Sequence, residues 1–232
     1  MAELCEEVFG DHSWRYQKPQ FRNPAEQQHL FDVNFDQLPA FRWRPEPIPK
    51  KPRVRIDTAL GEIELELDRD AAPKTVSNFL HYVHQGWYSD GVFYRTVTGE
   101  NQPDNDIKIA LIQASPAPDL IESLPPPIPL ERTRDSGLTH RHGSVTMSRE
   151  GLGTGLSTIE YAPDTARGDF AICIGDQPEL DYAGQRTYDG QGCAAFGMVV
   201  KGMEIIEEIH QSNADRQRLN PPIKIQRAVR LN

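Results

Sequence analysis

Short strand patterns dominate this chain and constrain its fold more than any other feature. Residues 54–58 and 62–67 alternate apolar with polar side chains on either side of a turn at Ala59-Leu60-Gly61, which predicts a β-hairpin. Further short strands are expected around residues 92–97, 109–114, 143–148, 169–174 and 194–200. Many short strands with few helices favour a closed β-barrel.

Only two stretches have the pattern of a helix. After Pro73, apolar side chains recur at the spacing of one helix face, at Val76, Phe79, Leu80 and Val83. Gly86 follows at a position where a glycine commonly ends a helix. A second helix is expected from Met203 to His210. The predicted domain is therefore mainly β, with a barrel that two helices cap.

Residues 1–50 differ from the rest, because they have no sustained period and are crowded with proline and aromatic side chains. We expect an arm that lies extended over the surface of a domain formed by residues 51–232. A flexible linker is the alternative. Residues 115–130, which include Pro125-Pro126-Pro127, are expected to run as polyproline II and to serve as a stiff connector.

Composition excludes several classes of protein. The 232 residues suffice for one compact domain with an extension, and a hydrophobic share of 38% fits a single core. The sequence contains no run of about 18 apolar residues, so no membrane span is predicted. The acidic N-terminus is unlike a secretory signal. The net charge of −9 disfavours binding to nucleic acid. We expect a cytoplasmic monomer that binds neither membranes nor nucleic acid.

The cysteines and histidines give no pattern of a metal centre. Cys5, Cys173 and Cys193 lack the spacing of paired or metal-binding cysteines, so reduced thiols are expected, with Cys173 in the core. Four histidines lie in pairs on the first helix and before a strand: His81, His84, His140 and His142. Since no carboxylate or cysteine completes either pair, we expect solvated histidines and predict neither a metal nor a cofactor.

Arg95 and Gln113 each lie within a short apolar strand pattern, Phe93-Tyr94-Arg95-Thr96-Val97 and Ala110-Leu111-Ile112-Gln113. On facing strands, a guanidinium and a carboxamide can hold a peptide group by hydrogen bonds without a nucleophile, an acid or a metal. This combination suits binding and twisting a peptide bond. The alternative is a surface arginine that pairs with Glu131 or with a carboxylate of an inserted segment.

From Val54 to Ile209 the sequence resembles the cyclophilin family of peptidyl-prolyl cis/trans isomerases. The resemblance lies in blocks that follow the family's order: Gly61–Leu67, Ala72–Phe79, Phe93–Arg95, Ile112–Gln113, Gly143–Arg149, Gly168–Cys173 and Phe196–Met203. It implies a closed eight-stranded antiparallel barrel with a helix capping each end, and an isomerase that needs no cofactor. Residues 100–109 and the region between Met147 and Gly168 are longer than is usual in the family.

The resemblance also implies the residues of the site. Arg95 takes the place of the family's catalytic arginine, which donates a hydrogen bond to the prolyl nitrogen, and Gln113 that of the glutamine that binds the substrate backbone. The other positions carried over to the substrate groove are Tyr94, Ala110, Leu111, Asp169, Phe170, Ala171, Glu179, Leu180 and Cys193. Ala110 and Ala171 replace aromatic rings of the family's proline pocket, and Glu179 replaces a tryptophan or phenylalanine.

Two functions remain open at this point. The first is a peptidyl-prolyl isomerase that acts on proline-containing peptides and client proteins and assists their folding. The second is a cyclophilin-fold module that binds a peptide or another ligand with little activity, and a variant of it has the N-terminal arm covering the groove. Arg95 and Gln113 favour the isomerase, whereas the missing pocket rings favour the binding module.

Overall fold

The computed structural model describes residues 48–103, 105–117, 125–149 and 163–232. The expected N-terminal arm, except for its last three residues, and part of the proline-rich segment, 118–124, lie outside the described residues. So do residues 150–162, most of the second long segment. The described residues belong to one compact unit, Pro47–Asn232.

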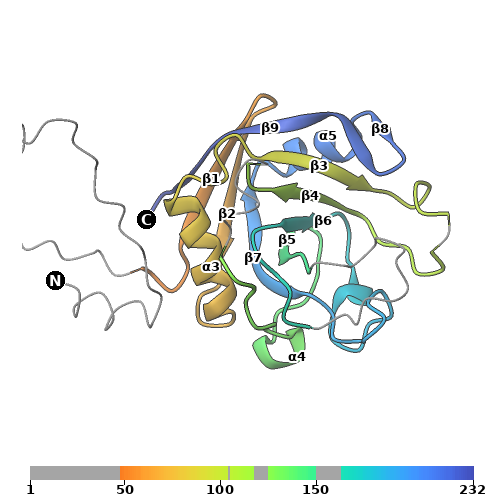
Figure 1. Ribbon diagram of the computed structural model, residues 1–232, viewed down its shortest axis with the longest axis horizontal. Helices are drawn as coiled ribbons and strands as arrows, with labels where there is room; N and C mark the ends of the chain where they lie inside the picture. Colours follow the sequence, from red (N-terminus) through yellow and green to blue (C-terminus); the bar gives the residue numbers. More distant parts are fainter. Residues whose placement is uncertain (1–47, 104, 118–124, 150–162) are drawn as a thin grey trace, which may run out of the picture. The chain divides into compact units, whose positions relative to one another are not determined.

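Eight strands close into an antiparallel barrel (Figure 1). Their order around the barrel is β1 (Arg53–Thr58), β2 (Glu62–Leu67), β7 (Ala194–Lys201), β5 (Ser144–Met147), β6 (Phe170–Cys173), β4 (Leu111–Ser115), β3 (Val92–Val97) and β9 (Arg218–Arg230). The pairing of β9 with β1 closes the ring, and the short strand β8 (Ala214–Asp215) extends it at β9. The predicted fold class is confirmed.

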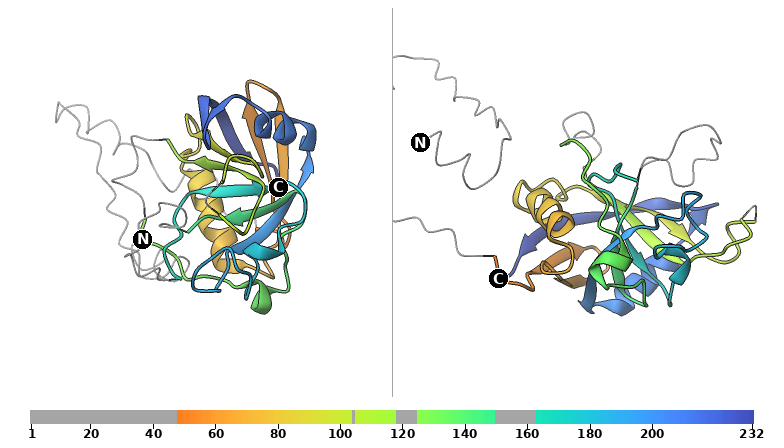
Figure 2. Two further views of the ribbon diagram at one scale, coloured as in Figure 1. Left: turned by 90° about the vertical axis from the view of Figure 1, so that its right-hand side faces the viewer. Right: turned by 90° about the horizontal axis from the view of Figure 1, so that it is seen from below.

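Both predicted helices are present. α3 (Pro73–His84) and α5 (Met203–His210) lie on opposite sides of the barrel (Figures 1 and 2). Two shorter helices, α4 (Thr133–Ser136) and the 3-10 helix η3 (Pro178–Leu180), are not predicted, because so few residues cannot display a helical repeat. None of the helices in the described ranges combines the length with the hydropathy that a membrane span requires.

Phe79 of α3 fills the interior of the barrel. Its ring centroid lies 5.3 Å from that of Phe170 in β6 and 5.3 Å from that of Phe196 in β7. All three side chains are fully buried. Burying one aromatic side chain of this size stabilises the fold by about 1.5–3 kcal/mol. On the other side, α5 contacts β2, β3 and β4 and contributes Ile206 and Ile209 to the same core.

A carboxylate from a distant segment holds the N-terminus of α3. Glu131 accepts hydrogen bonds from the backbone N–H groups of Lys74 (3.0 Å) and Thr75 (2.8 Å) and from the Thr75 hydroxyl (2.7 Å). Negative charge is favourable at this end of a helix, where backbone N–H groups are otherwise unsatisfied. Glu131 therefore acts as a helix cap, which excludes it as the partner considered for Arg95.

The strand β9 is not predicted by the sequence. Pro221 and Pro222 lie within it, and proline is rare in the middle of a sheet. Its buried side chains are Leu219, Ile225 and Ala228, and a register shift in the pairing with β1 breaks their alternation. Because β9 closes the barrel, the ring of eight strands follows from the resemblance and not from the strand patterns alone.

Cys173 and Cys193 are free and buried. Cys173 is 0% exposed, so the predicted core position is confirmed. Burial raises the pKa of the Cys173 thiol well above its ordinary value and that of Cys193 to about 11. Both thiols are therefore protonated at neutral pH, and protonated thiols are poor nucleophiles.

Candidate active site

Arg95 and Gln113 face each other across β3 and β4 on the outside of the barrel, where the register pairs them directly. In β6, Ala171 is the partner of Gln113. In β9, Arg218 is the partner of Arg95. Directly paired residues of antiparallel strands project from the same face. We call this line of paired residues, Ala171, Gln113, Arg95 and Arg218, the Arg95 row.

A β-bulge at Tyr94 interrupts β3 beside Arg95. The pairing of β3 with both of its neighbours shifts between Phe93 and Arg95, so Tyr94 has no partner in either ladder. The bulge directs Tyr94 toward Asp169, whose Oδ2 accepts a hydrogen bond from the Tyr94 hydroxyl at 2.8 Å. Burial, followed by the charge of Asp169, raises the pKa of Tyr94, so the hydroxyl stays protonated and can donate.

Two glutamines hold the guanidinium of Arg95. Its Nη1 donates to Oε1 of Gln113 at 2.9 Å, while Nε and Nη2 donate to Oε1 of Gln217 at 2.9 and 2.6 Å. Gln217 is fixed in turn, since its Nε2 donates to the carbonyl oxygen of Asn101 at 3.0 Å. A guanidinium has five N–H groups. These bonds leave one hydrogen on each terminal nitrogen of Arg95 for a ligand.

Arg95 keeps its positive charge although it is partly buried. Burial lowers the pKa of the guanidinium below its ordinary value. An arginine nevertheless keeps its proton at neutral pH, because its ordinary pKa is far above this range. Arg95 is therefore a fixed, partly desolvated cation, and hydrogen bonds from such a donor are stronger than in water.

Asp169 sets the orientation of the Gln113 carboxamide. Nε2 of Gln113 donates to Oδ2 of Asp169 at 3.4 Å, which leaves Oε1 to accept from Arg95. Since the amide nitrogen carries two hydrogens, one remains for the carbonyl oxygen of a ligand. Tyr94, Asp169, Gln113, Arg95 and Gln217 thus form one continuous chain of hydrogen bonds, in which each member orients the next.

The sequence does not predict Gln217 as a member of this chain. It lies in the turn between β8 and β9, two strands that the sequence patterns do not reveal. Its contact with Arg95 joins positions 122 residues apart. No local pattern marks the residue, because its role depends on the closure of the barrel.

Two residues farther along the same strands, a second row is apolar. Leu111 of β4 is paired with Val97 of β3 and with Cys173 of β6. These three belong to a hydrophobic cluster whose members are Val97, Ile109, Leu111, Ala171, Cys173 and Leu180. We call it the Leu111 cluster. The structure thus brings together Leu111, Ala171 and Leu180, as the resemblance implies, but each is at most 5% exposed.

The segment that precedes β4 closes the Leu111 cluster. Ile109 comes from this segment and is 6% exposed. Gln102 holds the segment in shape, since its buried Nε2 donates to the carbonyl oxygens of Thr98 (2.8 Å) and Ile109 (2.6 Å). Nη1 of Arg186 donates to the carbonyl oxygen of Ile107 at 2.8 Å and ties the segment to the loop after η3. Part of the segment that is long for the family therefore covers the expected pocket.

The resemblance implies that Phe170 lies at the substrate groove, but the structure places it elsewhere. Its ring is in the interior of the barrel, 5.3 Å from that of Phe79. Successive side chains of a strand project to opposite faces. Because Ala171 faces the Leu111 cluster, Phe170 must face inward. Ala110, directly before β4, is half-buried, and its carbonyl oxygen accepts from the N–H of Ile174 at 2.9 Å.

Glu179 and Cys193 also take structural positions. On η3, Oε2 of Glu179 accepts from the backbone N–H of Gln185 at 2.8 Å and braces the loop that follows. Cys193 is 5% exposed and senses the charges of Arg149 and Asp189, which form a largely buried ion pair. Neither side chain belongs to the Leu111 cluster.

A depression opens beside Arg95, over the hairpin of β8 and β9. Its volume is about 520 Å³, and it is lined by Tyr94, Arg95, Asp215, Arg216, Gln217 and Arg218. Unlike the Leu111 cluster, this depression is lined by polar and charged residues and is open to solvent. Arg95 therefore has a covered apolar cluster near one side and a charged depression on the other.

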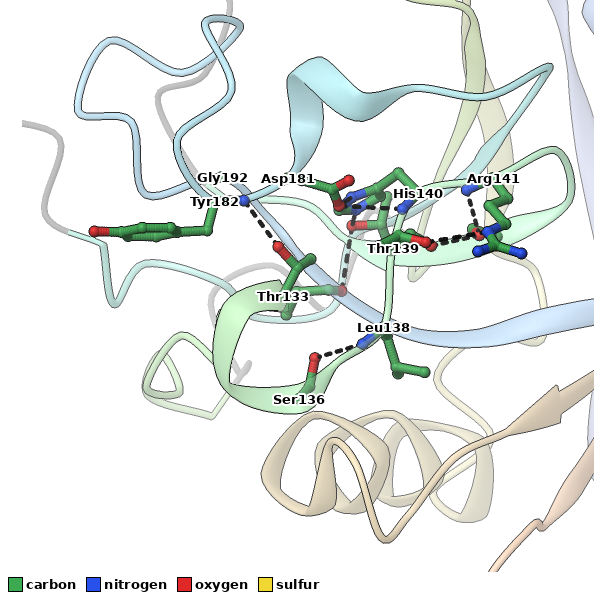
Figure 3. A network of polar contacts seen from close by, with 12 residues as sticks. Thr133, Ser136, Leu138, Thr139, His140, Arg141, Asp181, Tyr182 and Gly192 are labelled. Carbon is green, nitrogen blue, oxygen red and sulfur yellow. Dashed lines mark hydrogen bonds and ion pairs between the residues drawn. The ribbon is translucent and has the colours of Figure 1, made fainter.

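His140 is buried, which corrects the expectation of a solvated side chain. Its Nδ1 lies 2.7 Å from Oδ1 of Asp181, and its Nε2 lies 2.9 Å from Oγ1 of Thr146. Nearby, the backbone N–H of Tyr182 donates to the Thr133 hydroxyl at 2.8 Å (Figure 3). These polar partners make burial of the imidazole possible, and they fasten the loop after η3 to α4 and β5.

The other three histidines of the two predicted pairs are not equally exposed, because His81 is half-buried. His84 and His142 are exposed as predicted, and Nδ1 of His142 accepts from the N–H of Gly175 at 2.9 Å. Among the residues that the structure describes, no group of three His, Cys, Asp or Glu side chains could hold a metal ion.

Comparisons with known proteins find relatives of the whole barrel. Residues 53–230 match the family described as cyclophilin type peptidyl-prolyl cis-trans isomerase/CLD. The chain is 34% identical over 158 residues to peptidyl-prolyl cis-trans isomerase A of Dickeya dadantii, covering 68% of this chain and 70% of that protein. It is 28% identical over 182 residues to peptidyl-prolyl cis-trans isomerase cyp18 of Streptomyces antibioticus, covering 76% and 93%.

Solved structures agree on the fold. The crystal structure of a cyclophilin type peptidyl-prolyl cis-trans isomerase from Cryptosporidium parvum is similar with a TM-score of 0.60 and 21% sequence identity. The match covers 78% of this chain and 98% of that one. A second structure of that protein was determined in the presence of the dipeptide Ala-Pro and has the same TM-score of 0.60.

Proposed function

The chain belongs to the cyclophilin-type peptidyl-prolyl cis-trans isomerase family, and we propose that it accelerates the cis/trans isomerisation of X-Pro bonds in peptides and proteins. One observation carries the proposal. Arg95 and Gln113 are paired on the outer face of the barrel, joined at 2.9 Å, with hydrogens of both side chains left for a ligand.

The chemistry asks for hydrogen-bond donors and no covalent step. Rotation about a peptide bond must break its resonance, with a barrier of about 18–20 kcal/mol. In the twisted state the prolyl nitrogen becomes pyramidal and gains a lone pair, which a fixed guanidinium binds better than it binds either planar isomer. In the proposed mechanism Arg95 is that donor.

Gln113 anchors the substrate in this mechanism. The free hydrogen on its Nε2 is available to the carbonyl oxygen of the residue that precedes the proline, while Asp169 holds the carboxamide in position. Twisting requires one side of the bond to stay fixed while the other rotates. The chain of hydrogen bonds from Tyr94 to Gln217 supports this role, since a preorganised donor needs no reorganisation during the reaction.

The setting of the enzyme is part of the proposal. Clients are protein chains whose folding waits for an X-Pro bond, because uncatalysed exchange takes tens to hundreds of seconds. We propose a monomer in the cytoplasm, and the free thiols of Cys173 and Cys193 are consistent with the reducing conditions of that compartment. Sedimentation equilibrium tests the monomer, and refolding of a proline-limited protein with and without the full chain tests the folding role.

Exchange NMR on an Ala-Pro peptide tests the activity. The full chain is expected to accelerate cis/trans exchange. In Arg95→Ala the acceleration should be about 10²–10³-fold smaller, which is the effect of removing one well-placed donor. Arg227→Ala, at an exposed arginine of β9, is the matched control and is expected to retain the full rate. No acceleration by the full chain on any X-Pro peptide would overturn the proposed function. Full activity of Arg95→Ala would be compatible with an isomerase but would show that Arg95 has no catalytic role in it.

A further inference from the structure

Two arginines of the β8–β9 hairpin have no assigned role in the isomerisation itself. Arg216 and Arg218 flank Gln217, the residue that holds Arg95, and both line the 520 Å³ depression beside it. Both side chains are exposed. In the described part of the chain, no carboxylate lies within ion-pair distance of either one. They are charged groups that a ligand could reach.

We propose that this depression selects substrates with an acidic side chain one or two residues after the proline, and that Arg216 and Arg218 bind its carboxylate. The proposal rests on the proposed isomerase function and assigns it a substrate class. Guanidinium groups suit the task, because their planar N–H groups match the two oxygens of a carboxylate.

With the roles proposed for Gln113 and Arg95, the depression lies on the side of Arg95 that a substrate reaches after its proline. Gln113, Arg95 and Arg218 occupy consecutive strands of one row. Neighbouring strands lie about 4.8 Å apart, and an extended peptide advances about 3.3 Å per residue. If Gln113 binds the residue before the proline and Arg95 the prolyl nitrogen, Arg218 lies one or two residues beyond.

The local charge favours an acid although the whole chain is acidic. The lining contains three arginines and one carboxylate, Asp215. Asp215 is the ladder partner of Arg218, but the two do not form an ion pair among the described contacts. Arg186, which lies close enough to Arg95 for their charges to interact, adds a further cation nearby. The charge of Arg218 also acts on Tyr94, which places it within electrostatic reach of the site.

The depression suits a single acidic side chain better than a polyanion. Nucleic acid would need a run of cations along its phosphates, and the net charge of −9 would oppose it. A carboxylate or a phosphate monoester on a peptide needs only the two neighbouring arginines. These two sources share the same chemistry, so the experiment includes both.

The test compares X-Pro peptides that differ only in the second residue after the proline: Glu, Gln, Lys or phosphoserine. Exchange NMR with the full chain is expected to give a kcat/KM for the Glu peptide about three- to tenfold above that for the Gln peptide, the size that two exposed charge pairs provide. The Lys peptide should be the slowest. The ratio should shrink as the salt concentration rises, because exposed charges are screened. Equal values for Glu and Gln would overturn the inference and leave the isomerase intact.

Variants locate the effect. The double variant Arg216→Gln with Arg218→Gln should lose the ratio of Glu to Gln, whereas Arg227→Gln with Arg230→Gln, at two exposed arginines elsewhere on β9, should keep it. The same preference in the double variant would overturn the inference. So would an equal preference for Glu placed two residues before the proline, since this would reveal only a general attraction to acids.

A binding measurement separates this inference from the proposed function. If no peptide is isomerised, backbone amide shifts of the full chain still report where each peptide binds. Shifts at residues 214–219 with the Glu or phosphoserine peptide, and not with the Gln peptide, would support the acid site in an inactive protein. Equal shifts, or none, would overturn it.

Discussion

The Arg95 row and the row of Val97, Leu111 and Cys173 share β3, β4 and β6 but differ in how far their side chains are covered. In the Arg95 row, Arg95 and Gln113 expose hydrogens to a ligand and are held by hydrogen bonds. Two residues along the strands, Val97, Leu111 and Cys173 are covered and belong to a packed cluster. Arg95 and Gln113 are therefore available to a ligand, whereas the side chains of the second row are packed within the protein, together with Ala171 from the Arg95 row.

The difference shows that some contacts of a site depend on the register of strand pairing, whereas a pocket depends on the space that remains above the sheet. The contact between Arg95 and Gln113 is determined once β3 and β4 are in register, because partners in a ladder meet directly. A pocket also depends on what lies above the sheet. Here Ile109, Leu180 and the Arg186 bridge to Ile107 lie there, and they come from segments outside the strands.

Truncating Leu111 tests the packed side with the largest expected effect on stability. Leu111→Ala should lower the free energy of unfolding by about 2–5 kcal/mol, because it removes side-chain contacts in a filled cluster and leaves a cavity. Urea unfolding measures the change. Val200→Ala, at a 45% exposed position of β7, is the control and should change it by less than about 0.5 kcal/mol. A small loss of stability with a large rise in KM would instead describe an open pocket wall.

Restoring an aromatic ring tests whether space remains. Ala171→Phe places a ring where the family carries one, but Ala171 is 3% exposed within the cluster. Overpacking of this kind costs about 1–3 kcal/mol, and thermal unfolding should show it. Ala110→Phe is the matched change at a half-buried position and should cost less. A stable Ala171→Phe with faster isomerisation would show that the Leu111 cluster leaves space for a ring and is not filled as described.

Removing Gln217 tests how the Arg95 row is preorganised. Gln217→Ala deletes the acceptor of the bonds from Nε and Nη2 of Arg95. We expect a roughly tenfold lower kcat with little change in KM, equivalent to about 1.4 kcal/mol of transition-state stabilisation. Gln217→Glu keeps the acceptor oxygen for Arg95 but loses the hydrogen bond from Nε2 to Asn101, and should recover part of the rate.

The control for Gln217 is Gln226→Ala, an exposed glutamine of the same strand, which should retain the wild-type kcat. A change in KM alone in Gln217→Ala would assign the residue to substrate binding. An unchanged rate would mean that Gln113 suffices to orient the guanidinium.

The sequence predicts the strands that carry Arg95 and Gln113, because apolar alternation and the family blocks agree there. It also identifies Tyr94 and Asp169, although the bulge that brings their side chains together is not visible in the pattern. Gln217 is missed because β9 contains Pro221 and Pro222 and has no regular alternation. Short-range patterns therefore predict elements, whereas contacts made by barrel closure require the fold.

His140 shows a different limit of the sequence. A histidine just before a strand is most simply solvated, yet hydrogen bonds to Asp181 and Thr146 make burial of His140 favourable. The partners lie 41 and 6 residues away. Neither spacing predicts a contact, because both hydrogen bonds depend on how the loop after η3 packs against β5.

The stability of the protein at acid pH tests the packed side with the smallest expected effect. The loop after η3, beside the Leu111 cluster, contains Asp189, which forms an ion pair with Arg149. Burial alone would raise the pKa of Asp189, but hydrogen bonds from Arg149 and the Gln191 N–H and the Arg149 charge lower it below its ordinary value of 3.8. A carboxyl whose pKa is lower in the folded state stabilises the fold above its unfolded pKa of about 3.9. This stabilisation is lost as the pH falls through the folded pKa. Urea unfolding between pH 6 and pH 3 should therefore show that the free energy of unfolding falls toward acid, and that it falls less in Asp189→Asn than in the wild type. An equal dependence on pH in the two proteins would show that this ion pair does not stabilise the loop.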